Sequence, residues 1–96
     1  MLQSITKIVQ SMVLDGQIPV KKLAERVNKP YATLLRELNP YDNGAKLGVE
    51  TLVDIMRVTQ NTEPLRHMAD ELGYTLVPKS RIPESTEMFG ILQHEG

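Results

Sequence analysis

The chain has 96 residues, no cysteine and two histidines, and its 11 basic and 12 acidic residues give a net charge of −1. This length suits one domain with one hydrophobic core, and the absence of cysteine excludes disulfides and thiolate metal sites. The start of the sequence lacks the order of a signal peptide, and no apolar run approaches membrane-spanning length. We therefore expect a soluble cytoplasmic protein with no membrane partner.

The charge is unevenly distributed along the chain. Residues 20–46 carry six basic and three acidic residues, a local charge of +3, whereas residues 61–96 carry three basic and six acidic residues, a local charge of −3. A net charge of −1 is unusual for a nucleic-acid binder, but phosphate would lie beside the basic segment. So little positive charge predicts weak DNA binding by one copy, and therefore assembly of several copies.

The first predicted element is an amphipathic helix from about Leu2 to Asp15, which Gly16 can end. Its apolar residues recur in steps of three and four, the spacing of one helical face: Leu2, Ile5, Ile8, Val9, Met12 and Val13. This apolar face needs a partner, and the segment that starts at Pro19 is the nearest candidate.

Residues Val20 to Leu38 are predicted to form two short helices joined by a tight turn. One face of the first helix carries Val20, Leu23, Ala24 and Val27, and the second helix carries Leu34, Leu35 and Leu38. Asn28 tolerates a left-handed backbone, and Pro30 suits the start of a new helix. Ala24 is small enough for the two helices to cross closely, with Leu34 packed over it. This pattern predicts a helix-turn-helix, whose second helix can enter a DNA major groove.

An ordinary helical hairpin in a small bundle stays open as the alternative, because it shows the same apolar spacing. Glu37 also departs from the helix-turn-helix pattern. It stands three residues after Leu34, where many such sequences have an apolar residue, and here that residue comes one position later, at Leu38.

Two further helices complete the predicted domain. After the turn-forming segment 39–44, Gly48 can cap a helix that runs to about Thr59, with inward-facing Val49, Leu52, Val53, Ile55 and Met56. Residues 60–61 interrupt the pattern. A fifth helix then starts at Thr62 or Glu63 and ends before Gly73, with inward-facing Leu65, Met68, Ala69 and Leu72.

The residues after Gly73 change character. Tyr74 to Val77 favour extended structure, which can become a short strand only if it finds a partner. Ser85 can cap a last helix that holds Met88, Phe89, Ile91 and Leu92. The predicted fold is therefore all-α, with a compact five-helix helix-turn-helix domain in residues 1–73. Residues 74–96 form a C-terminal tail, which either joins copies of the chain or packs back on its own domain or is disordered.

Three stretches resemble the phage regulatory protein CII family of temperate P2-like coliphages and their prophages. They are Lys29-Pro30-Tyr31 through Leu38-Asn39-Pro40, Gly44-Ala45-Lys46-Leu47-Gly48-Val49-Glu50-Thr51-Leu52, and Asp54-Ile55-Met56. The likeness covers about residues 2–73, and the five helices also resemble the lambda-repressor-like fold. This resemblance implies a sequence-specific DNA-binding protein that governs transcription in the choice of lysogeny, usually as an oligomer. It leaves activator and repressor both open.

If residues 30–38 form the reading helix, its polar side presents four candidates for contact with base edges, namely Tyr31, Ala32, Thr33 and Arg36. Arg36 can donate a bidentate fork to guanine, and Ala32 or Thr33 can touch a thymine methyl group. Four lysines are candidates for phosphate contact: Lys21, Lys22, Lys29 and Lys46. Structural roles compete with these assignments, because Arg36 can pair with a neighbouring carboxylate and Tyr31 can belong to the core.

The partners expected are a double-stranded DNA operator, further copies of the chain in a dimer or tetramer, and RNA polymerase if the protein is an activator. A helical adaptor or anti-regulator without DNA binding is the alternative, and it fits the acidic second half of the chain. An enzyme is not expected, because the sequence offers no carboxylate pair, no nucleophile with a base and no glycine-rich phosphate loop. Neither a cofactor nor a metal is expected.

Overall fold

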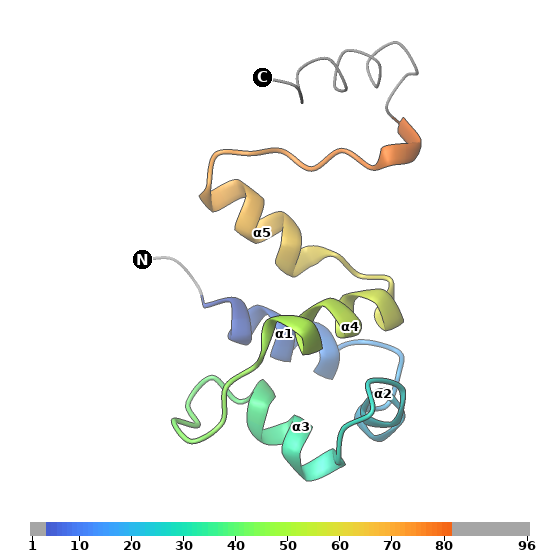
Figure 1. Cartoon of the computed structure of the whole chain (residues 1–96), viewed down its shortest axis with the longest axis vertical. Coiled ribbons are helices and arrows are strands. Elements are labelled where there is room, and N and C mark those ends of the chain that lie inside the picture. Colours follow the sequence, from blue (N-terminus) through green and yellow to red (C-terminus); the bar gives the residue numbers. More distant parts are fainter. Residues whose placement is uncertain (1–3, 82–96) are drawn as a thin grey trace.

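The computed structural model describes residues 4–81, and all regular structure in this range is helical (Figure 1). The five α-helices are α1 (Ile5–Leu14), α2 (Val20–Arg26), α3 (Tyr31–Leu38), α4 (Val49–Thr59) and α5 (Glu63–Glu71). A 3₁₀ turn at Lys79–Arg81 follows them. The predicted all-α class and its five helices are confirmed. The predicted helix start at Leu2 and the predicted helix after Ser85 lie outside the described residues.

Three of the helices end in the same way. The first or second residue past each end has a positive φ, namely Asn28 at 60°, Gln60 at 56° and Gly73 at 86°. The next N–H then donates to the carbonyl five residues before it, as Lys29 does to Ala24, Asn61 to Met56 and Tyr74 to Ala69. These bonds satisfy carbonyls that a helix end leaves unpaired. The left-handed turn predicted at Asn28 is thereby confirmed.

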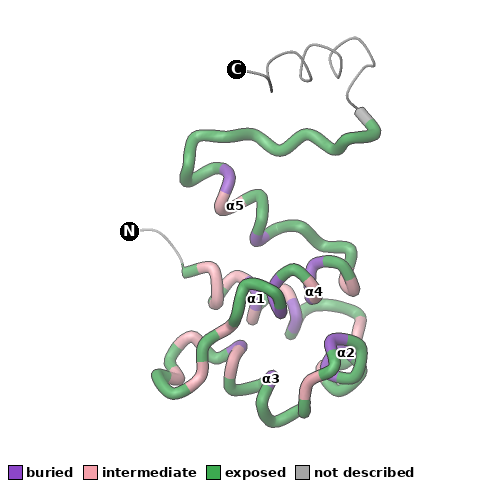
Figure 2. The backbone as a smooth tube through the Cα atoms, in the orientation of Figure 1, coloured by how far each residue is buried: buried purple, intermediate pink, exposed green. Residues whose placement is uncertain are grey.

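One cluster of buried apolar side chains joins the first four helices (Figure 2). Its members are Val9, Val13, Leu23, Ala24, Val27, Leu34, Leu38, Leu52, Ile55 and Met56. Helix α1 packs against both α3 and α5, and α2 packs against α3 and α4. Ala24 and Leu34 are both buried in this cluster, as the predicted close crossing of α2 and α3 requires.

Several residues predicted to face inward are exposed. Leu35 is 38% exposed, because the two-turn helix α3 buries only Leu34 and Leu38, which lie one turn apart. In α4 the buried residues are Thr51, Leu52, Ile55 and Met56, whereas Val49, in the first turn, and Val53 are exposed. In α5, Leu65 and Leu72 are exposed, because this helix buries only Pro64 and Ala69 fully.

Tyr74 to Val77 form an extended segment, as predicted, and the optional short strand is not formed. These residues have no regular secondary structure, and all four are exposed. A lone strand needs a partner for its backbone hydrogen bonds, and residues 4–81 contain no second strand. The segment therefore runs extended over the end of the molecule that lies away from α2 and α3 (Figure 1).

The neighbouring leucines of α3 give a matched test of this core. Leu34→Ala should lower the free energy of unfolding by about 2–5 kcal/mol, because the side chain is fully buried and its removal leaves a cavity. Leu35→Ala should cost about 1 kcal/mol or less, because its side chain is partly in water. Urea unfolding of both variants measures the difference, and equal losses would contradict the assigned orientation of α3.

Candidate nucleic-acid interface

Helix α3 lies at the end of the molecule farthest from α5 (Figure 1). Ala32, Thr33 and Arg36 point away from its buried leucines, and Tyr31, three residues before Leu34, lies at the edge of the leucine face. We call this exposed side of α3 its polar flank. All four residues predicted to contact bases are exposed on this helix: Tyr31, Ala32, Thr33 and Arg36. The helix follows α2 after the turn at residues 27–30, and the α2–α3 pair forms the predicted helix-turn-helix. The structure thus brings the four candidates together on one short helix.

Tyr31 lies at the start of α3 and is 41% exposed, so it is not a core residue. The Nζ atom of Lys21, in the first turn of α2, lies 5.5 Å from the centroid of the Tyr31 ring. A cation at this distance from an aromatic face is attracted by the ring quadrupole. The contact links the first turns of α2 and α3 on the exposed side.

Arg36 is exposed and paired with Asp42 in the loop that follows α3. Its Nε donates to Asp42 Oδ2 at 3.0 Å, and its Nη2 donates to Asp42 Oδ1 at 3.4 Å. The hydrogen bond from Arg36, with that from the Gly44 N–H, lowers the pKa of the Asp42 carboxyl, and the same bond to Asp42 raises the pKa of Arg36. The pairing with a carboxylate, which the sequence left open, is therefore present.

Lys29, in the turn between α2 and α3, is paired with Glu37 on α3. The Nζ of Lys29 lies 3.0 Å from Glu37 Oε2, and the two side chains are 27% and 14% exposed. Glu37 Oε1 is buried and has no hydrogen-bond partner among the described residues. The pair explains why a carboxylate stands where related motifs have an apolar residue. It also holds Lys29, a predicted phosphate contact, in an ion pair.

The other predicted phosphate contacts are exposed. Lys21 and Lys22 lie in the first turn of α2, and Lys46 lies in the loop between α3 and α4. Within residues 4–81, none of the three forms a salt bridge. Helix α2 and the α3–α4 loop therefore carry three exposed lysines that have no carboxylate partner among the described residues.

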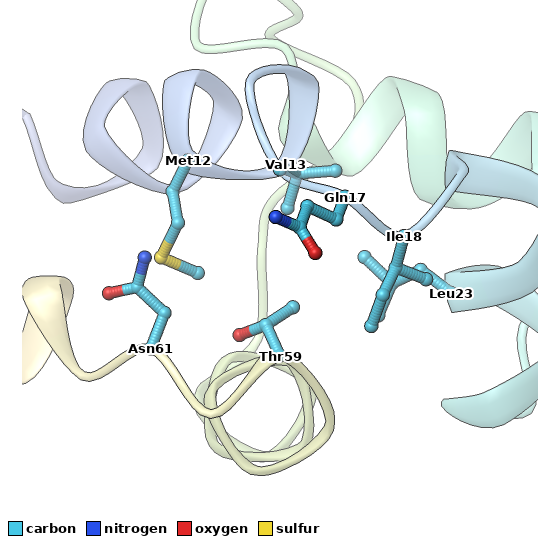
Figure 3. A pocket seen from close by; sticks show the side chains of 8 residues that line it. Met12, Val13, Gln17, Ile18, Leu23, Thr59 and Asn61 are labelled. Atoms are coloured by element: carbon cyan, nitrogen blue, oxygen red, sulfur yellow. The ribbon is translucent and has the colours of Figure 1, made fainter.

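A cavity of about 340 Å³ lies on another part of the molecule, between the end of α1 and the connection from α4 to α5 (Figure 3). Its lining residues are Met12, Val13, Gly16, Gln17, Ile18, Leu23, Thr59 and Asn61. The Thr59 hydroxyl already donates to the Ile55 carbonyl at 2.7 Å. With amides and apolar groups but no charged side chain, this lining provides no acid, base or activated nucleophile.

Residues 4–81 contain neither a cluster of metal ligands nor a membrane-spanning helix. The described part of the chain holds no group of three or more histidine or carboxylate side chains that is close enough to bind a metal ion. Its longest helix, α4, has 11 residues, and none of its helices is long and apolar enough to cross a bilayer.

The family model for phage regulatory protein CII (CP76) matches residues 3–94. The chain belongs to this family. The predicted resemblance is confirmed, and the match reaches through the tail, beyond the predicted limit at Gly73. No curated protein and no solved structure matches the chain, so its likeness to the lambda-repressor-like fold stays a prediction.

Membership in the phage regulatory protein CII family establishes a regulatory role for the chain. A regulatory family also favours a protein that is not an enzyme. The family match does not address the individual contact residues, so Tyr31, Ala32, Thr33, Arg36 and the four lysines stay predictions.

Sequence reasoning missed two residues beside Arg36. Asp42 accepts the Arg36 fork, and its Oδ1 also accepts the N–H of Gly44 at 2.8 Å. A Cβ on Gly44 would lie 2.9 Å from Arg36 Nη2, so the absence of a side chain at Gly44 leaves room for the guanidinium beside Asp42. The sequence signal was an aspartate two residues before a glycine in a turn-forming segment, a spacing at which Asp accepts a backbone N–H.

The pairing predicts an acid-shifted titration of Asp42. Its carboxyl should titrate below its ordinary pKa of 3.8, because the charged form accepts hydrogen bonds from Arg36 and Gly44. In Arg36→Ala the pKa should rise toward that value, and Arg36→Lys should retain part of the shift. NMR titration of the side-chain carboxyl carbon measures all three.

The sign of the linked stability follows from the lowered pKa. The pair stabilises the fold above the unfolded pKa of Asp42, and this contribution is lost as the pH falls through the lower folded value. An Asp42 pKa that is the same in the wild type and in Arg36→Ala would show that the pair is not populated in solution.

Proposed function

We propose that this phage regulatory protein is a sequence-specific DNA-binding regulator of transcription in the control of phage or prophage lysogeny. In this proposal residues 1–73 form the DNA-binding domain, and α3 enters the major groove of a double-stranded operator. The observation that carries the proposal is the exposure of all four predicted contact residues on the polar flank of α3, while Leu34 and Leu38 anchor the helix in the core.

The distribution of positive charge supports the same docking. Lys21 and Lys22 in the first turn of α2 and Lys46 in the α3–α4 loop are exposed on either side of the reading helix. Side chains in these positions suit the two phosphate backbones that border a major groove. Lys29 is a weaker candidate, because a phosphate would have to compete with Glu37 for it.

Assembly of several copies is part of the proposal. The net charge of −1 and the ion pairs at Lys29 and Arg36 leave one copy few free cations for phosphate. A dimer or tetramer would double or quadruple that number and read repeated half-sites. Large exposed apolar side chains at the other end of the molecule support an interface there, formed by α5 and the start of the tail: Leu65, Leu72, Tyr74 and Val77.

The same ion pairs favour one alternative function. Because both Lys29 and Arg36 are paired with carboxylates, α3 can also be an ordinary bundle helix in a protein-binding adaptor or anti-regulator. An activator would in addition contact RNA polymerase, whereas a repressor would not need that contact. The adaptor or anti-regulator differs from the proposed regulator because it binds no DNA.

Selection from a DNA pool separates these functions. The full-length chain is incubated with duplexes of random sequence and with fragments of a phage genome, and bound duplexes are recovered and sequenced. The proposal predicts enrichment of one motif that is repeated at about one helical turn. An adaptor would retard no DNA, even at low salt.

Two variants test the assignment of roles within the interface. Arg36→Ala should lower affinity for the recovered motif and relax its preference at one base pair, by about 1–3 kcal/mol of discrimination. Lys22→Ala should weaken binding to all sequences alike and reduce the slope of log affinity against log salt by about 1. Filter binding across a salt series measures both effects. An unchanged motif preference in Arg36→Ala would remove this residue from base reading.

The oligomeric state is measured by sedimentation at micromolar concentration. The proposal predicts dimers or tetramers under conditions that give full affinity for the recovered motif. A monomer with that same affinity would contradict the assembly.

A further inference from the structure

The ion pair at the end of α3 uses only part of the Arg36 guanidinium. Asp42 occupies the edge formed by Nε and Nη2, with distances of 3.0 and 3.4 Å. A guanidinium has five N–H groups in one plane, and two of its edges can each grip a pair of acceptors. The second edge, formed by Nη1 and Nη2, carries no hydrogen bond among residues 4–81 and belongs to a side chain that is largely in water.

The loop that carries Asp42 is itself held in place. The Asn39 side-chain oxygen accepts the N–H of Tyr41 at 2.9 Å, and the Asn39 carbonyl accepts the N–H of Asp42 at 3.1 Å. Asp42 Oδ1 then accepts the N–H of Gly44 at 2.8 Å. The carboxylate that holds Arg36 is therefore fixed by the backbone on both sides of it.

We propose that Asp42 is a specificity-determining positioning residue, which holds Arg36 by one edge so that the other edge is aimed at the two acceptors of a guanine. This inference rests on the proposed function. A free arginine side chain loses rotamer freedom when it grips a base, and an arginine that is held beforehand loses less. The carboxylate also repels phosphate, so Arg36 is kept from serving as a sequence-independent contact.

Gly44 completes the arrangement. A Cβ at this position would lie 2.9 Å from Arg36 Nη2, which is the flexible end of a side chain, so alanine would displace the guanidinium rather than the backbone. The φ of Gly44 is not in the left-handed region, so alanine can adopt the same backbone. Gly44→Ala therefore moves the fork without changing any charge.

Selectivity, and not affinity alone, is the quantity that tests this inference. The base pair to alter is the one at which Arg36→Ala has lost its preference. Selectivity is then the ratio of the affinity for a duplex recovered by the full-length chain to the affinity for the same duplex with that base pair changed. Asp42→Asn should reduce this selectivity about tenfold while its affinity for unrelated DNA rises, and Gly44→Ala should reduce it as well.

Two variants control for charge and for the glycine change. Asp54→Asn removes the same charge from another exposed ion pair, with Arg57 on α4, and should leave the selectivity unchanged. Gly48→Ala, in the same loop, has no atom within 4 Å of its new Cβ and should also leave the selectivity unchanged.

In the absence of DNA, the NMR resonance of the Arg36 Nε–H reports its hydrogen bond to Asp42. It should be protected from exchange in the wild type and lose this protection in Asp42→Asn. If the wild type binds its motif and Asp42→Asn shows unchanged or increased selectivity, the positioning role of Asp42 is overturned and the proposed function is not. A wild type that binds no duplex would instead overturn the proposed function, and the positioning role with it.

Discussion

The contact between α2 and α3, in which Ala24 and Leu34 are both buried, is the constraint on which the rest of the structure depends. Helix α3 has eight residues and is far too short to be stable alone in water. Its orientation is therefore set by the two leucines that it buries, and these leave the flank with Tyr31 and Arg36 in solvent. The left-handed turn at Asn28 makes this crossing possible, because it reverses the chain within a few residues.

Ion pairs then fix the charged side chains of α3, which hydrophobic burial does not position. Both charged side chains of α3 are paired with residues outside the helix, Glu37 with Lys29 in the preceding turn and Arg36 with Asp42 in the following loop. Both side chains belong to the last turn of α3, and the two pairs tie this turn to the segment before the helix and to the loop after it, which favours a rigid surface over a strongly positive one. In the proposed function, a surface of this kind gains selectivity from preorganised contacts and little affinity from charge, and this agrees with the proposed assembly of several copies.

Apolar spacing in the sequence was sufficient to predict the five helices and the close crossing of α2 and α3, because these follow from local periodicity and turn chemistry. It could not predict which residues at the edge of each apolar face stay exposed. Leu35, Val49 and Leu72 are apolar at helical spacing, yet the short helices do not bring all of each face against a neighbour. The pairing of Arg36 with Asp42 depends on the path of the loop, which periodicity does not describe. Glu37 was recognised as a departure from the motif, but its partner Lys29 became evident only when the turn was placed.

The central claim is that the polar flank of α3 is the surface that meets DNA, and NMR mapping tests it most directly. Backbone amide shifts of the ¹⁵N-labelled chain are followed as a recovered duplex is added. The account predicts the largest changes at residues 31–33 and 36, with smaller ones at 21–22 and 42–46. Amides of α3 that stay unchanged while those of α1 or α5 shift would contradict it.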